Sequence, residues 1–297
     1  MKTDQIRGGS TLVFVIVVVA VVTSLALGAG AMLASRLALN SDAALRDELR
    51  REASSAAALA AWMIDGDTNG VDHVREEWAI GFVSGDVEVS VEDEMARIKF
   101  QDANEAALAA LMVTVSPRDA PLGAEEATGQ ASAAYSWWNA LRILETNRIL
   151  YAEEELLAAP ATSPEALARA LPRLSVLGQG KVNVNTAGRE VFVALVVGAG
   201  GNAETAERLY RRVERSRARG EYFESIGLLD ARKLLGGGGG DPVTQEEARV
   251  LQMISQQLCV ESGLFRITAT ASRGGAVKVV QCVYERGTGR IMRWLEY

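Results

Sequence analysis

The chain has 297 residues, of which 48% are hydrophobic, and a formal net charge of −7. This length and apolar content can bury one or two cores, and the absence of a dense Lys/Arg run argues against nucleic acid as a partner. The sequence holds a single histidine, His73, and no nucleophile-elbow or HExxH motif, which argues against an enzyme.

An uncharged apolar stretch runs from Ser10 to Ala34. At about 1.5 Å per residue, a helix of this length covers the roughly 30 Å hydrocarbon core of a bilayer. The stretch is longer than the core of a secretory signal, and its small residues come late, so an uncleaved anchor is favoured over an ordinary signal peptide. Lys2 and Arg7 precede it, which predicts a cytoplasmic amino terminus and an exported remainder at the inner membrane.

The helical pattern continues beyond the apolar stretch. Apolar residues recur at spacings of three and four from Leu45 to Met63. One helix is therefore predicted over residues 10–63, which is longer than a plain anchor requires.

The segment after this helix, Asp65 to Trp78, matches the calcium-loop pattern D-x-D-x-N-G-x5-E. The predicted calcium ligands are Asp65, Asp67, Asn69 and Glu76. Asp72 departs from the pattern, because an apolar residue is usual at that position. The alternative is a helix-ending turn in which Asp and Asn side chains cap backbone groups. No cofactor is required, and calcium is the one the sequence suggests.

Strand patterns flank a helical middle, which indicates an α+β fold. Val87 to Phe100 reads as two half-buried strands joined by an acidic turn, and Phe265 to Leu295 as an antiparallel meander. Cys259 and Cys282 precede and enter this meander. An oxidising compartment would permit a disulfide between them, and two buried thiols are the alternative.

Two motifs lie in the helical middle. The segment Gly180 to Ala187, GKVNVNTA, is a short strand that turns into a helix, with Asn185 or Thr186 as the expected cap. Gly198 to Gly201 then separates two helices, as in helix-hairpin-helix modules that bind DNA phosphates. The hairpin lacks basic neighbours on its entry side, which favours protein packing, although an arginine cluster follows it: Arg211, Arg212, Arg215, Arg217 and Arg219. The glycine run Gly236 to Gly240 lacks the Lys-Ser/Thr ending of a phosphate loop and reads as a flexible loop.

The order of these motifs resembles the minor pseudopilin K family of type II secretion systems. The residues that carry the resemblance are Arg7-Gly8-Gly9 before the apolar helix, the strand region Val87 to Phe100, the GKVNVNTA segment, the hairpin region and the terminal strands. The resemblance implies a long transmembrane helix, a pilin-like antiparallel sheet and a large helical insertion containing a helix-hairpin-helix-like (SAM-like) region. The implied parts are a leader 1–9, a spine helix 10–63, a first pilin-like part 64–103, an insertion 104–244 and completing strands 245–297.

In such a protein, a prepilin peptidase would cut between Gly9 and Ser10, or after Gly8, and the new amino terminus would be methylated. Phe14 stands where most pilins carry a glutamate, which a subunit at a filament tip can omit because no neighbour lies above it. The implied function is to cap and initiate the pseudopilus with the I and J pseudopilins. The alternatives are a minor pilin of a type IV pilus and a membrane-anchored helix-hairpin-helix DNA-binding protein.

Overall fold

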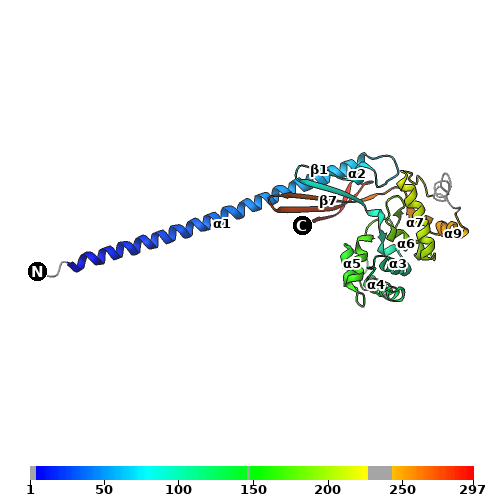
Figure 1. Ribbon diagram of the computed structural model, residues 1–297, viewed down its shortest axis with the longest axis horizontal. Coiled ribbons are helices and arrows are strands. Elements are labelled where there is room, and N and C mark those ends of the chain that lie inside the picture. Colours follow the sequence, from blue (N-terminus) through cyan, green and yellow to red (C-terminus); the bar gives the residue numbers. More distant parts are fainter. Residues whose placement is uncertain (1–4, 146–147, 227–242) are drawn as a thin grey trace.

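The computed structural model describes residues 5–145, 148–226 and 243–297, with side chains from residue 12 onward. The glycine run at 236–240 lies outside the described residues. Figure 1 shows three parts in line: a long helix α1, a sheet lying along its second half, and a helical domain beyond the sheet.

Helix α1 spans Gln5–Gly66 without a break, which confirms the predicted helix. Its second half buries a stripe of mostly small residues against the sheet: Leu49, Ala53, Ala56, Ala57, Ala60 and Ile64. Alanines allow the helix backbone to lie close to the strands, so a narrow stripe suffices to fix the helix on the sheet. The helix ends at the turn-forming segment that follows Met63.

The five-stranded antiparallel sheet has the order β1-β2-β7-β8-β9. Its strands are β1 (Phe82–Ser84), β2 (Val87–Asp93), β7 (Leu264–Arg273), β8 (Ala276–Glu285) and β9 (Arg290–Glu296). The predicted alternation is observed, because β2 buries every second residue from Val87 to Asp93. The buried face packs on α1, and the opposite face is called the open face below.

The helical domain is inserted between β2 and β7. Its helices are α3 (Glu105–Thr114), α4 (Ala124–Leu144), α5 (Pro164–Ala170), α6 (Arg189–Gly198), α7 (Ala203–Ala218) and α9 (Gln245–Ile254). They share a core that includes Phe100, Phe192 and Phe223. Helix α9, which the sequence analysis grouped with the terminal strands, also contributes Val250 and Ile254 to this core. The helical domain therefore reaches further along the chain than residue 244.

The expected strand pair between Val87 and Phe100 is not formed. Strand β3 (Ile98–Lys99) has only two residues and pairs in parallel with β4 (Leu174–Ser175) in the helical domain. The acidic turn is a 3₁₀ helix, Glu94–Ala96, through which the chain leaves the sheet. A second parallel pair joins β5 (Val182–Asn183) to β6 (Leu258–Cys259).

Helices α6 and α7 form the predicted helix-hairpin-helix. Gly200 has a φ of +87°, and a Cβ on Gly201 would lie 2.7 Å from the Val196 side chain. Both positions therefore require glycine. Asn202 caps α7 by accepting a hydrogen bond from the Thr205 backbone.

Candidate functional site

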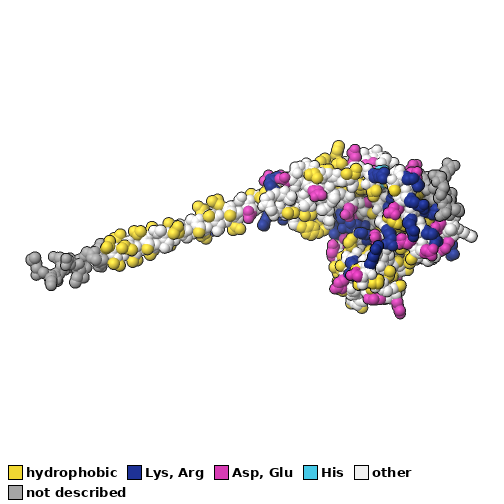
Figure 2. All heavy atoms as spheres, viewed as in Figure 1, with side chains coloured by type: hydrophobic (Ala, Val, Ile, Leu, Met, Phe, Trp, Pro, Cys, Tyr) yellow, Lys and Arg dark blue, Asp and Glu magenta, His cyan; other side chains and the backbone are white. Residues whose placement is uncertain are grey.

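The first candidate feature is the amino-terminal half of α1. Its large hydrophobic side chains from Leu12 to Leu39 are exposed on all sides, and Phe14 is 68% exposed. By length and composition, this helix could cross a membrane. The predicted processing residues Gly8, Gly9 and Ser10 lie in the first turns of α1. Figure 2 shows the hydrophobic side chains along this part of the helix.

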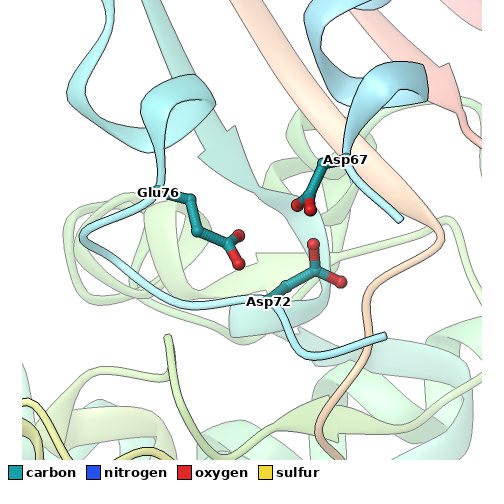
Figure 3. A group of neighbouring side chains, drawn as sticks. All are labelled: Asp67, Asp72 and Glu76. Atoms are coloured by element: carbon teal, nitrogen blue, oxygen red, sulfur yellow. The ribbon is translucent and has the colours of Figure 1, made fainter. Parts of the chain in front are cut away.

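The acidic loop that follows α1 gathers three carboxylates. Asp67, Asp72 and Glu76 each offer an oxygen within 4.8 Å of the others, and Figure 3 shows their carboxylates converging from three sides. Asp67 and Glu76 were predicted as calcium ligands. Asp72, which the sequence pattern set aside, is the third member.

Of the other two predicted ligands, Asp65 points away from the three carboxylates, whereas Asn69 contacts one of them. The Asp65 carboxylate accepts a hydrogen bond of 2.5 Å from the Tyr284 hydroxyl on β8, so it anchors the end of α1 to the sheet. Asn69 accepts a hydrogen bond from the Val71 backbone and donates one to Glu76 at 2.8 Å. The loop therefore also has the turn contacts that the alternative interpretation predicts.

The carboxylates are partly neutralised by donors from the chain itself. The Arg286 guanidinium pairs with Asp72 and lies 3.8 Å from Asp67. The Trp78 indole donates to Glu76 at 2.5 Å. Burial raises the pKa of both Asp72 and Glu76. The Ser262 N–H and Arg286 lower the pKa of Asp72, and hydrogen bonds from Asn69 and the His73 N–H lower that of Glu76. Hard carboxylate oxygens suit calcium, and the oxygens of Asp67 and Glu76 fit such an ion better than those of Asp65.

Calcium binding at this loop is a testable proposal. We expect calcium chloride to raise the melting temperature of the full chain in detergent, because a ligand that binds only the folded state stabilises it. The substitutions Asp67→Asn and Glu76→Gln should each abolish the rise. Asp65→Asn is the matched control and should keep it, because that carboxylate serves Tyr284. A melting temperature that calcium leaves unchanged in the wild type would refute calcium binding.

A buried polar cluster lies where the sheet meets the helical domain. The amide of Asn183 on β5 donates to the Asp93 carboxylate at 3.0 Å, and the hydroxyls of Ser262 and Thr186 donate to the same oxygen at 2.6 and 2.5 Å. Asn183 also contacts the backbone carbonyl of Asp72 at 3.1 Å. Burial raises the pKa of Asp93 to about 6, against these hydrogen bonds. The cluster thus joins β2, β5, the acidic loop and the start of β7.

The GKVNVNTA segment supplies this cluster, and its role differs from the predicted one. Neither Asn185 nor Thr186 caps α6; Gly188 occupies that position without a side-chain hydrogen bond. Asn185 instead bonds to both the N–H and the C=O of Phe223, each at 2.9 Å. The polar residues of this segment therefore connect parts of the chain that lie far apart in sequence.

An ion cluster of Glu94, Glu153, Arg266 and Arg293 joins the helical domain to the open face of the sheet. Glu153, in the 3₁₀ helix Glu153–Ala158, accepts from Arg266 at 2.9 Å and from Arg293 at 2.5 Å. Glu94 binds Arg266 through both carboxylate oxygens at 2.9 Å. All four side chains are at most 12% exposed, so the cluster is a buried attachment point.

The arginine cluster on α7 is partly committed to the fold. Arg212 is buried and lies 3.4 Å from Glu247 of α9. Arg217 donates to the backbone carbonyls of Ala187 and Val184, and Arg219 pairs with Glu221. Arg212 and Arg217 are therefore held in the fold, whereas Arg219 stays at the surface, so the surface available for binding DNA has two arginines fewer than the sequence suggests.

The two cysteines are free thiols in the structure. Cys282 packs in the core between α1 and the sheet, whereas Cys259 lies on β6 beside Met95 and Val283. Burial raises the pKa of the Cys282 thiol to about 11 and that of Cys259 to about 12. No disulfide joins the two cysteines in the structure, where Cys282 is buried and Cys259 is half-buried.

Comparison with solved structures gives a likeness of fold. No protein-family model and no curated protein matches the chain. It is similar to GspK in the crystal structure of the GspK-GspI-GspJ complex from the enterotoxigenic Escherichia coli type 2 secretion system, with a TM-score of 0.57. The match covers 84% of this chain and 96% of that one. The chain has a GspK-like pseudopilin fold. At 14% sequence identity, this likeness is one of fold.

Proposed function

We propose that this protein is a minor pseudopilin of a type II secretion system and occupies the position of GspK. In this role it caps and initiates the pseudopilus together with the I and J pseudopilins, for the export of folded proteins. The observation that carries the proposal is the GspK-like fold across 84% of the chain. GspK itself was crystallised in complex with GspI and GspJ.

The position of the helical domain supports a place at the tip. It lies beyond the end of the sheet that is furthest from the amino terminus of α1 (Figure 1). Pilin-like subunits stack along their helices, so a bulky domain at this end would collide with a subunit placed above. A subunit at the tip has no such neighbour, and Phe14 in place of the usual pilin glutamate agrees with that position.

The amino-terminal half of α1 anchors the protein in the inner membrane, with its amino terminus in the cytoplasm and the remainder outside. Exposed apolar residues from Leu12 to Leu39 support this assignment. A prepilin peptidase removes the leader between Gly9 and Ser10, or after Gly8, and the new amino terminus is methylated.

The mass of the amino-terminal peptide tests this proposal. In cells with the prepilin peptidase, we expect the membrane-bound protein to begin at Ser10, or at Gly9, and to carry one added methyl group. In cells without the peptidase, we expect an intact Met1. A chain cut near Ala31, or an intact Met1 in both strains, would contradict the assignment to the pseudopilins.

A deletion strain separates this function from the nearest alternative. Loss of the protein should abolish the export of folded enzymes and leave type IV pili unchanged. The opposite result, lost pili and normal secretion, would assign the protein to a type IV pilus instead.

A further inference from the structure

The open face of the sheet carries an apolar patch at β8 and β9. Val277 is 55% exposed and Tyr297 is 63% exposed, and Val279 and Leu295 are half-buried. Val280 and Cys282 of β8 face α1, so Val277 and Val279, at odd positions of the same strand, face the other way. Tyr297 exchanges two backbone hydrogen bonds with Val279 and therefore lies opposite it. These side chains therefore share the open face. Figure 2 shows hydrophobic atoms on the lower side of the sheet, where this patch lies.

The helical domain provides a second apolar wall. Ile149 is 55% exposed and Tyr151 is 67% exposed. They immediately precede Glu153, which pairs with Arg293 on the open face at 2.5 Å. Arg293 precedes Leu295 and Tyr297 by two and four residues, so the ion cluster fixes the helical domain beside one end of the patch. We call the surface formed by Ile149, Tyr151, Val277, Leu295 and Tyr297 the notch.

The notch opens toward the amino-terminal half of α1. Arg273, at the turn between β7 and β8, pairs with Glu48 and Glu52 of α1, whereas the helical domain closes the other end of the sheet (Figure 1). Any occupant must therefore approach from the membrane side. Apolar patches rich in tyrosine are typical of protein interfaces.

A bilayer surface does not reach the notch. The uncharged stretch ends at Ala34, and 14 further residues of helix place Glu48, the partner of Arg273, about 21 Å beyond it along α1. The headgroup layer extends only about 5–8 Å past the hydrocarbon core. Tyr151 lies still further away, beside the ion cluster.

We propose that the notch seats the globular head of a second, membrane-anchored pseudopilin that lacks a comparable helical insertion. The spine helix of such a subunit stands beside α1. One subunit can therefore cover the notch with its head and the exposed apolar residues of α1 with its helix. A second copy of this chain fits less well, because its helical domain would collide with the helical domain that borders the notch. This inference rests on the proposed function and names the surface through which the I or J pseudopilin binds.

Photo-crosslinking in cells tests the notch directly. A photoreactive phenylalanine analogue is placed at Tyr151, Val277 or Tyr297 of the full chain, and at Val83 as a control. Val83 is 74% exposed on β1, at the opposite edge of the sheet. We expect the three notch positions to crosslink to the tagged I or J pseudopilin of the host, and Val83 to give none. Adducts only to lipid or to a second copy of this chain would overturn the inference, as would adducts to I or J from Val83 alone.

Charge substitutions distinguish failure of the notch from failure of the proposed function. The double variant Tyr151→Asp/Val277→Asp should reduce co-purification of the I and J pseudopilins by at least about tenfold, since desolvating a charge weakens an interface. Val83→Asp, which adds a charge at a similarly exposed site, should leave it unchanged. Undiminished co-purification with a correctly folded double variant refutes the notch and leaves the proposed function standing. If I and J fail to co-purify even with the wild type, the proposed function falls and this inference falls with it.

Discussion

Replacing Glu153 with alanine should destabilise the protein by about 3 kcal/mol or more, because breaking a buried ion pair leaves uncompensated charge. After the substitution, Arg266 would keep its contact with Glu94, and Arg293 would lose the Glu153 carboxylate that it contacts at 2.5 Å. For a chain of this size, the melting temperature should fall by about 5 °C or more, because the entropy of unfolding is about 2.1 cal/mol/K per residue. Thermal unfolding of the full chain in detergent, followed by circular dichroism, measures the change.

Glu154 provides the matched control for this prediction. It is adjacent in sequence and 63% exposed, and it lies 4.0 Å from Arg293. Glu154→Ala should cost less than about 1 kcal/mol, as is usual for exposed pairs. Equal melting temperatures for the Glu153 variant and the wild type would mean that the ion cluster does not hold the helical domain to the sheet.

The second large effect is a pH dependence that originates at Asp93. Its pKa of about 6 in the folded protein lies above its ordinary value of 3.8. The folded state therefore binds a proton more tightly than the unfolded state. The resulting stability is fully present below about pH 4 and is lost as the pH rises through about 6. A difference of about two units corresponds to roughly 3 kcal/mol.

The variant Asp93→Asn cannot titrate at this position and isolates the effect. The free energy of unfolding of the wild type, minus that of the variant, should fall by roughly 3 kcal/mol between pH 4 and pH 7. Asp72, with its partner Arg286, is the charged pair that faces this cluster. Glu92→Gln, on the exposed side of the same strand, is the control and should follow the wild type. A difference that stays constant with pH would show that Asp93 is ionised throughout.

The parts of the fold that depend on local patterns were predictable from the sequence. The helix to Gly66 follows from apolar spacing, and β2 follows from strict alternation of Val87, Val89 and Val91 with polar residues. The helix-hairpin-helix followed from its glycines. In each case, the residues that decide the element lie within a few positions of one another.

The contacts between the sheet and the helical domain were not predictable in the same way. Ile98 has the pattern of a strand in the main sheet, yet its partner is Leu174 in the helical domain. Asn183 lies in a strand, as predicted, but its side-chain partners Asp93 and Ser262 lie 90 and 79 residues away. Two features of the sequence indicated that these polar side chains have buried partners. Buried strands seldom alternate valine with asparagine, and Asp72 departed from the calcium pattern. Sequence spacing alone could not say which distant groups satisfy these polar side chains.

The insertion of the helical domain into the sheet has a consequence for how the molecule folds. Glu94 and Arg266, which bind each other, are 172 residues apart, so β2 must wait for strands made near the end of the chain. Pairing over such a separation is intrinsically slow, because a large loop must close before any contact forms. During synthesis and export, the small-residue stripe of α1 stays uncovered until β7 and β8 arrive, and so does the edge of β2 that pairs with β7. The helical domain, whose contacts are more local, is expected to form first and to bring the two halves of the sheet together.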